Sequence, residues 1–142
     1  MSGIRGKNTK PELIIRSGLH RRGYRFRLHS NRLPGRRDIV LPKYRAAIMV
    51  HGCFWHGHNC HLFKMPATRT EFWKNKITKN QQRDQDNRER LKTSGWRLLE
   101  IWECALKGKF ALSRENLIER CVTWLEGGGS HLEIEGGSYV DR

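Results

Sequence analysis

The chain has 142 residues, of which 28 are Lys or Arg and 14 are Asp or Glu, so its formal charge at pH 7 is +14. This length suits one domain and is too short for two sizeable cores, and a hydrophobic fraction of 37% argues against intrinsic disorder. No apolar run is long enough to cross a membrane, and the N-terminal residues lack the apolar segment of a secretory signal. We therefore expect a cytoplasmic protein whose partner is a polyanion, with nucleic acid first and an anionic membrane surface second.

The N-terminal third of the chain is expected to form one helix and several short strands. Thr9 to Glu12 matches a capping box with Pro in the first turn, and Gly23 is the expected end of this helix. Residues 25–29 alternate polar and apolar side chains, which is typical of a short strand. The apolar runs at 38–41 and 45–51 are separated by a Pro-containing turn, so they predict a hairpin.

The rest of the chain adds two helices and one buried strand. Residues 70–94 are strongly helical and charged, with an unusually polar inner face at Asn80 and Asp84. Residues 96–102 form an apolar strand, and a last helix starts near Ser113. The Gly-rich segment 127–142 is expected to be a flexible tail. These elements predict a single α/β domain over residues 1–126, with a small mixed sheet flanked by helices.

Cysteine and histidine residues are concentrated in one short segment, HGCFWHGHNCH, at residues 51–61. It holds four of the seven histidines and two of the four cysteines. An even distribution would place about one Cys or His in such a window, and a reducing compartment favours metal or catalytic use over disulfides. The clustering therefore requires a chemical explanation.

A structural zinc site is the first explanation. Cys53, His58 and Cys60 lie close together on an irregular loop, and Cys104 follows the buried strand, so it completes a Cys3His set if that strand neighbours residues 45–51. The spacing alone does not separate Cys104 from Cys121 as fourth ligand, although Cys121 lies on the apolar face of the last helix. A set of unrelated buried cysteines is the alternative.

An acid–histidine site is the second explanation. Asp38 begins one hairpin strand and His51 ends the other, so both fall at the same end of the hairpin. A carboxylate can hold Mg²⁺ for phosphodiester hydrolysis, while His51 and His56 can transfer protons or position water. The alternatives are a turn residue for Asp38 and a strand-end surface residue for His51. Glu12 fits either a capping box or a contact to metal-bound water.

Two adjacent aromatic residues, Phe54 and Trp55, lie between the expected zinc ligands. Both cannot point inward from a tight loop, and an exposed aromatic ring in a basic protein can stack on bases or wedge between base pairs. The alternative for Trp55 is a place at the edge of the core.

Several blocks of the sequence together resemble the very short patch repair endonucleases, which are bacterial Mg²⁺-dependent nickases for T:G mismatches. The blocks are LPGRRDIV, VHGCFWHGHNC, KMPATRTEFW and GWRLLEIWEC, within a match from about Asn8 to Trp124. The resemblance implies a restriction-endonuclease-like α/β core with a structural zinc. It also implies duplex DNA with a T:G mismatch as substrate, a monomeric enzyme that acts at the nucleoid, and a MutL-type mismatch-repair protein as a candidate partner.

The resemblance also implies a role for individual residues. Asp38 matches the Mg²⁺ ligand, assisted by the main-chain carbonyl of Val50, and the catalytic group is completed by His51, His56 and Glu12. The matched zinc ligands are Cys53, His58, Cys60 and Cys104. The matched DNA contacts are the wedge residues Phe54, Trp55 and Met1, and the base-reading residues Lys76 and Asn80. Family members often carry a longer N-terminal arm, so a shortened clamp is expected where Met1 is the first residue.

Two other functions remain compatible with the charge and the aromatic pair. One is a zinc-stabilised DNA-binding module without catalysis, and the other is a restriction-type endonuclease that cuts both strands of unmodified sites. Asp38 together with His51 and His56 favours an enzyme, because a binding module has no use for a carboxylate beside the DNA backbone.

Overall fold

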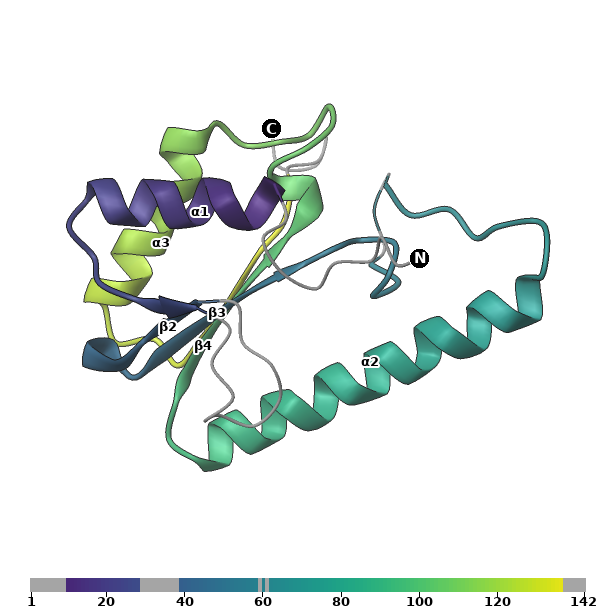
Figure 1. Ribbon diagram of the computed structural model, residues 1–142, viewed down its shortest axis with the longest axis horizontal. Helices are drawn as coiled ribbons and strands as arrows, with labels where there is room; N and C mark the ends of the chain where they lie inside the picture. Colours follow the sequence, from purple (N-terminus) through teal and green to yellow (C-terminus); the bar gives the residue numbers. More distant parts are fainter. Residues whose placement is uncertain (1–9, 29–38, 59, 61, 137–142) are drawn as a thin grey trace.

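A five-stranded mixed sheet lies between two layers of helix in the computed structural model, which describes residues 10–28, 39–58, 60 and 62–136 (Figure 1). The strands follow the order β1-β2-β3-β4-β5 across the sheet. Strand pairing is antiparallel from β1 to β3 and parallel from β3 to β5. The elements in chain order are α1 (Lys10–Arg21), β1 (Arg27–Leu28), β2 (Ile39–Leu41), the 3₁₀ turn η1 (Pro42–Tyr44), β3 (Ala46–His51), α2 (Thr70–Thr93), β4 (Arg97–Trp102), the 3₁₀ turn η2 (Glu103–Ala105), α3 (Arg114–Glu126) and β5 (His131–Ile134).

The predicted helix and hairpin of the N-terminal third are confirmed. Helix α1 ends just before Gly23, whose φ of 86° is the left-handed conformation that glycine adopts without strain. Strands β2 and β3 pair with Ile39 opposite Ile48, and the connection ends at Arg45 in the left-handed region. His51 is therefore the last residue of a central strand.

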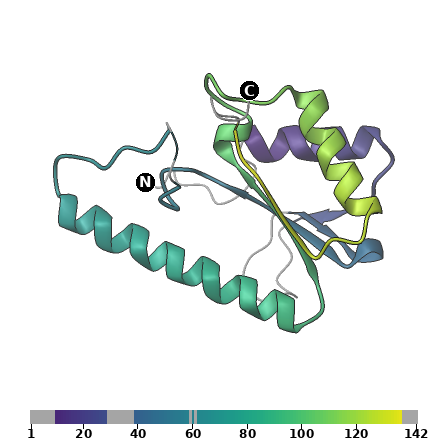
Figure 2. The same cartoon turned by 180° about the vertical axis from the view of Figure 1, so that it is seen from behind.

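Helices α1 and α3 cover one face of the sheet, and α2 covers the other (Figures 1 and 2). The main core joins Ile15 and Leu19 of α1 to one face of the strands and to the apolar side of α3. Alternate residues of β3 and β4 point to the opposite face, where Ala47 and Leu98 contact Leu91 near the end of α2. This alternation explains why both strands consist mainly of apolar residues.

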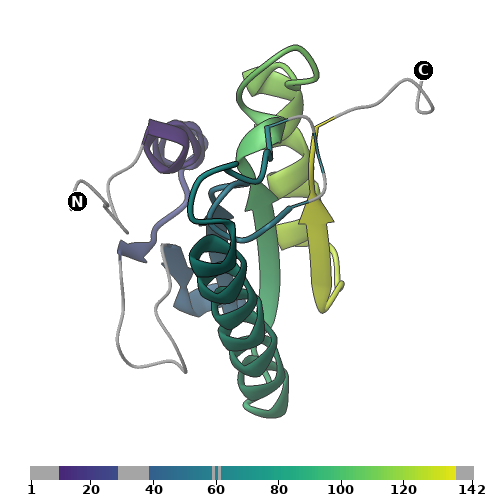
Figure 3. The ribbon, with the colours of Figure 1, turned by 90° about the vertical axis from the view of Figure 1, so that its right-hand side faces the viewer.

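The predicted long helix connects two parallel central strands. Helix α2 links β3 to β4, which pair with His51 opposite Trp102. Figure 3 shows β4 between β3 and β5. Because β3 and β4 are parallel neighbours, the loop after His51 and the 3₁₀ turn after Trp102 emerge from the same edge of the sheet. This edge carries the candidate site.

Helix α3 is capped at both ends. The Ser113 side chain accepts a hydrogen bond from the backbone N–H of Asn116, as the sequence suggested for a start near Ser113. At the other end, Arg97 of β4 donates hydrogen bonds to the carbonyl oxygens of Trp124, Leu125, Gly127 and Gly129. Its guanidinium also lies 4.3 Å from the centroid of the Trp124 ring. One strand residue thus bonds two of the carbonyl groups at the end of the helix and two in the connection that follows it.

The described part of the predicted flexible tail, residues 127–136, is ordered against the sheet, and residues 137–142 lie outside the described residues. Residues His131–Ile134 form β5, which pairs in parallel with β4, with Leu98 opposite His131. The segment HLEI alternates polar and apolar residues, and Ile134 is buried in the main core. The three glycines at 127–129 hid this pattern, because they form the connection between α3 and β5 rather than the start of a disordered end.

None of the helices in the described ranges is both long and apolar enough for a membrane crossing.

Candidate active site and metal centre

Two histidines occupy the edge of the sheet where β3 ends. His51 is 2% exposed, and its Nε2 lies 2.8 Å from Oε1 of Glu100 on the neighbouring strand. The His51 ring also packs against the rings of His56 and Trp102, with centroid distances of 4.6 Å and 4.7 Å. The orientation of His51 is therefore set by contacts on several sides.

The second histidine, His56, belongs to the turn that follows β3 and reaches across to α2. Its Nδ1 lies 2.5 Å from Oδ2 of Asp84. Helix α2 also fixes the main chain of this turn, because Asn80 donates to the carbonyl of Trp55 at 2.8 Å and Gln81 donates to that of His56 at 3.2 Å. The polar inner face of α2 thus serves to hold this turn.

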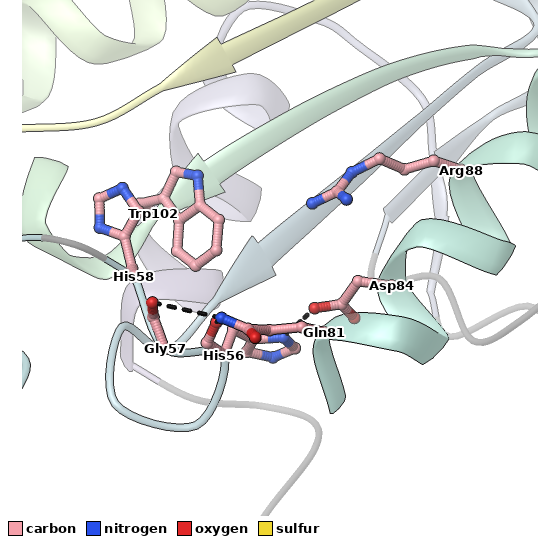
Figure 4. A pocket seen from close by; sticks show the side chains of 7 residues that line it. All are labelled: His56, Gly57, His58, Gln81, Asp84, Arg88 and Trp102. Carbon is pink, nitrogen blue, oxygen red and sulfur yellow. Dashed lines mark hydrogen bonds and ion pairs between the residues drawn. The ribbon is translucent and has the colours of Figure 1, made fainter. Parts of the chain in front are cut away.

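A small cavity opens beside His56 (Figure 4). It measures about 270 Å³ and is lined by His56, Gly57, His58, Gln81, Asp84, Arg88 and Trp102. One ligand atom each from His51, His56 and Asp84 lies within 4.8 Å of the others. Gly57 adopts a φ of 62°, and a side chain there would collide with Gln81 and Ile77 of α2. The turn can therefore approach the helix closely only with glycine at this position.

Buried charge shifts the pKa values in this group. Burial lowers the pKa of His51 below its ordinary value, which favours the neutral imidazole. Burial alone would raise the pKa of Glu100, but hydrogen bonds from His51 and Arg88 outweigh it, so the pKa of Glu100 falls below its ordinary value. Glu100 is therefore an ionised carboxylate at neutral pH, facing a neutral histidine.

The predicted zinc ligands converge next to this group. Ligand atoms of Cys53, His58, Cys60 and Cys104 lie within 4.8 Å of one another. The Nδ1 atom of His58 lies 3.6 Å from Sγ of Cys53 and 3.7 Å from Sγ of Cys104. A tetrahedral zinc with ordinary Zn–S and Zn–N bond lengths places its ligand atoms about 3.5 Å apart. The four side chains therefore fit a structural zinc ion, which would join the turn after β3 to the end of β4.

Groups around the cluster favour metal binding. Nε2 of His58 lies 2.9 Å from Oε1 of Glu135, which leaves Nδ1 directed at the sulfur atoms. The backbone N–H of Gly136 donates to Sγ of Cys104 at 3.2 Å. A hydrogen bond from Cys53, helped by that of Gly136, lowers the pKa of the Cys104 thiol to about 6. A thiolate is the form that binds zinc.

Cys121, the alternative fourth ligand, lies elsewhere. It is fully buried in the main core on α3, and burial raises the pKa of its thiol to about 12. The interpretation of Cys121 as a core residue is confirmed.

The remaining residues of the predicted site fall in different places. Glu12 is buried in the first turn of α1, where Arg16 lies 3.4 Å away. Val50 is half-buried and packs on the main core, Lys76 is exposed on α2, and Asn80 is half-buried there. Asp38 and Met1, the predicted metal ligand and the predicted third wedge residue, lie outside the described residues.

The predicted wedge residues belong to a cluster of aromatic rings. Phe54 packs edge-on against Trp55 and Trp73, with ring centroids 5.2 Å and 5.4 Å away, and stacks on Phe63 at 6.0 Å. Both Phe54 and Trp55 are half-buried. The expectation that the two rings cannot both point fully inward agrees with this arrangement.

Sequence reasoning did not assign roles to several residues of this group. Asp84 stood out only as a polar residue on an inner helix face, while Glu100, Arg88 and Glu135 received no role. Glu100 did carry a signal, because it is the only charged residue inside the buried run LLEIW. A charge at such a position requires partners from elsewhere in the fold.

The sequence of the chain is similar to those of several known enzymes. A family model described as DNA mismatch endonuclease Vsr matches residues 1–62. The chain is 47% identical over 135 residues to the DNA mismatch endonuclease Vsr of Escherichia coli (strain K12). This alignment covers 95% of this chain and 86% of that protein. It is 48% identical over 112 residues to the type II nicking enzyme V.XorIIP of Xanthomonas oryzae pv. oryzae, covering 79% of this chain and 82% of that protein. It is 44% identical over 117 residues to the type II nicking enzyme V.NmeAIP of Neisseria meningitidis serogroup A, covering 82% and 83%.

Proposed function

This chain belongs to the Vsr family of DNA mismatch endonucleases, and we propose that it nicks duplex DNA on the 5′ side of the thymine in a T:G mismatch. The reaction is hydrolysis of one phosphodiester bond with Mg²⁺ as cofactor. The resemblance seen in the sequence is thereby confirmed at the level of the family, and the names of its relatives support a DNA-cleaving hydrolase. The biological role we propose is repair of thymine produced by deamination of 5-methylcytosine.

The observation that carries the proposal is the pairing of His56 with Asp84 beside His51. Asp84 engages Nδ1 of His56, so Nε2 of the same ring is the atom available for proton transfer. The neighbouring His51 is buried and its ring orientation is set. A protein that only binds DNA would gain nothing from a strand-end histidine beside a second histidine that a helix carboxylate orients.

The metal chemistry that we propose depends on oxygen ligands. Asp38 would hold Mg²⁺ with the main-chain carbonyl of Val50, and carboxylate and carbonyl oxygens are the ligands that Mg²⁺ prefers. Ile39, which follows Asp38 in the sequence, pairs with Ile48, two residues before Val50. When bound, the ion neutralises charge that develops on the phosphate and orients water. His51 and His56 would accept hydrogen bonds from the attacking water. Glu12 would support the same network of water molecules.

DNA recognition is proposed for the aromatic cluster and for α2. Phe54 and Trp55, with Met1, would wedge beside the mismatch, and Lys76 and Asn80 would contact the mismatched bases. Because Phe54 packs against Trp73 in this structure, insertion into DNA requires this ring contact to be exchanged for base stacking. The net charge of +14 supplies sequence-independent attraction to the phosphates on both sides of the cut.

A structural role is proposed for Zn²⁺ bound by the Cys3His cluster. Three of its four ligands flank or follow His56 in the turn after β3, and the fourth, Cys104, follows β4. The bound ion would hold His56 at a fixed distance from the sheet. We propose that the enzyme acts as a monomer, with a MutL-type mismatch-repair protein as candidate partner.

A nicking assay on labelled duplexes tests the proposal. Purified zinc-loaded protein and Mg²⁺ are incubated with a duplex that carries one T:G pair in varied flanking sequences, and with the matched T:A duplex. We expect a single nick 5′ of the mismatched thymine in at least one flanking context. Binding without a nick in any context would instead support the non-catalytic module, and cleavage of both strands of matched DNA would support a restriction-type enzyme.

Replacement of the proposed metal ligand separates catalysis from binding. Asp38→Ala is expected to abolish nicking and to leave DNA affinity largely unchanged, because DNA affinity depends mainly on phosphate contacts. An equal loss of nicking and affinity would contradict the role of Asp38.

A further inference from the structure

Glu100 is an acidic residue buried in a strand of otherwise apolar residues. It is 1% exposed and lies between Leu98 and Trp102 on the face of β4 that is covered by α2. Burial of a carboxylate is costly unless the group is paired and hydrogen-bonded, and apolar residues at such a position are often as stable or more stable. The fold alone therefore does not account for a charge at this position.

Three side chains from three different elements meet at this carboxylate. Oε1 lies 2.8 Å from Nε2 of His51, and Nε of Arg88 donates to both oxygens at 3.0 Å and 2.8 Å. On the far side, Nε2 of His131 in β5 lies 2.7 Å from Oε2. Arg88 thus neutralises the carboxylate, and the ionised form can only accept hydrogen bonds.

The ring of His51 has little freedom to avoid this contact. Its side chain is 1% exposed, and the rings of Trp102 and His56 lie against it. A neutral imidazole opposite an acceptor must carry its proton on the nitrogen that faces the acceptor. In His51 that nitrogen is Nε2, so the lone pair of the neutral ring is on Nδ1.

We propose that Glu100, held by Arg88, is a positioning residue that fixes His51 as the Nε2–H tautomer and so makes its Nδ1 a hydrogen-bond acceptor. The functional consequence of this inference rests on the proposed role of His51 in the nicking reaction. Asp84 engages His56 through Nδ1, which leaves Nε2 as the acceptor of that ring. Two carboxylates on different elements therefore hold the two histidines in opposite tautomers, with the lone pair on Nδ1 of His51 and on Nε2 of His56.

The tautomer can be measured without any activity. Long-range ¹H–¹⁵N correlation spectra of ¹⁵N-histidine-labelled, zinc-loaded protein report which ring nitrogen carries the proton, and His51→Gln assigns the signals. We expect His51 to be the Nε2–H tautomer in the unsubstituted protein and a mixture of tautomers in Glu100→Gln. An Nδ1–H tautomer in the unsubstituted protein, or an unchanged tautomer in Glu100→Gln, would overturn the inference.

Single-turnover nicking then tests the consequence. Glu100→Gln is expected to lower the nicking rate by about 10- to 100-fold, which is the usual effect of removing a group that orients another, with unchanged DNA affinity. The matched control is Glu133→Gln, the residue opposite Glu100 on β5, which accepts a hydrogen bond from Trp102. The Glu133→Gln control should nick at a rate within about twofold of that of the unsubstituted protein, because Glu133 does not contact His51 or His56.

A double variant tests the inference in case Glu100→Gln does not fold. Glu100→Gln leaves Arg88 without its carboxylate, whereas Glu100→Leu combined with Arg88→Leu replaces the ion pair with apolar side chains and should fold. We expect the folded double variant to bind DNA and to nick slowly, and a rate equal to that of the unsubstituted protein would contradict the inference. If the unsubstituted protein fails to nick T:G duplexes, the proposed function fails, while the tautomer spectra still decide the role of Glu100.

Discussion

Replacement of Asp84 by Asn provides a sharp test of the histidine site. The substitution keeps the size of the side chain but removes its negative charge, and the amide can donate where the carboxylate only accepted. His56 Nδ1 lies 2.5 Å from Asp84 Oδ2, and the two side chains are 23% and 10% exposed. The pair is therefore shielded from water, and its electrostatic interaction is only partly screened.

The expected magnitude follows from this geometry. When His56 takes a proton in the reaction, the imidazolium and the carboxylate have charge centres about 4 Å apart, and they attract by about 4 kcal/mol at an effective dielectric constant of about 20. That energy corresponds to about a 10³-fold change in rate, and partial solvent screening lowers the expected loss to between about 10² and 10³. DNA affinity should change little, because Asp84 makes no favourable contact with phosphate.

The assay is single-turnover nicking of a T:G duplex with saturating protein, with affinity measured separately by fluorescence anisotropy. Asp86→Asn is the matched control, because Asp86 is exposed on the same helix and lies outside the cavity lining. A rate for Asp84→Asn within about threefold of the unsubstituted protein would refute proton transfer by an Asp84-oriented His56, since the electrostatic argument requires a far larger loss. A parallel fall in rate and affinity would assign Asp84 to DNA binding instead.

Three further predictions concern metal content, stability and titration. Elemental analysis should find one zinc equivalent in the unsubstituted protein and in Cys121→Ser but none in Cys53→Ser, and retention of metal by Cys53→Ser would refute the site. Arg97→Leu should lower the free energy of unfolding in urea by about 3 kcal/mol, because it leaves partly buried carbonyls at the end of a helix unpaired; a loss below about 1 kcal/mol would contradict this cap. Burial and the neighbouring Glu126 raise the pKa of Tyr24 above its ordinary value of 10, so Glu126→Gln should lower that pKa in an alkaline absorbance titration. Because the folded state favours the protonated phenol of Tyr24, this phenol contributes to the free energy of unfolding below pH 10, and its contribution declines as the pH rises further. An unchanged pKa of Tyr24 in Glu126→Gln would contradict the interaction between the two side chains.

Local pattern in the sequence determined the elements and the type of site. A capping box, a Pro-containing turn and runs of apolar residues are short-range signals, and they located α1, the β2–β3 hairpin, α2, β4 and α3. The cluster of Cys and His residues likewise indicated a metal centre, and Cys104 joined it because β4 is the parallel neighbour of β3. Such inferences succeed because each depends on residues close in sequence or on one strand pairing.

Only the tertiary structure decided which charged groups face the histidines. His51 contacts Glu100 across 49 residues of sequence, and His56 contacts Asp84 across 28. Strand β5 was not predicted for the same reason, since this short strand is stabilised by pairing with β4 rather than by local propensity. The sequence around Glu100 indicates that a charge within an apolar run requires partners, but it does not identify them. The packing of α2, β4 and β5 around one edge of the sheet determines which groups these partners are.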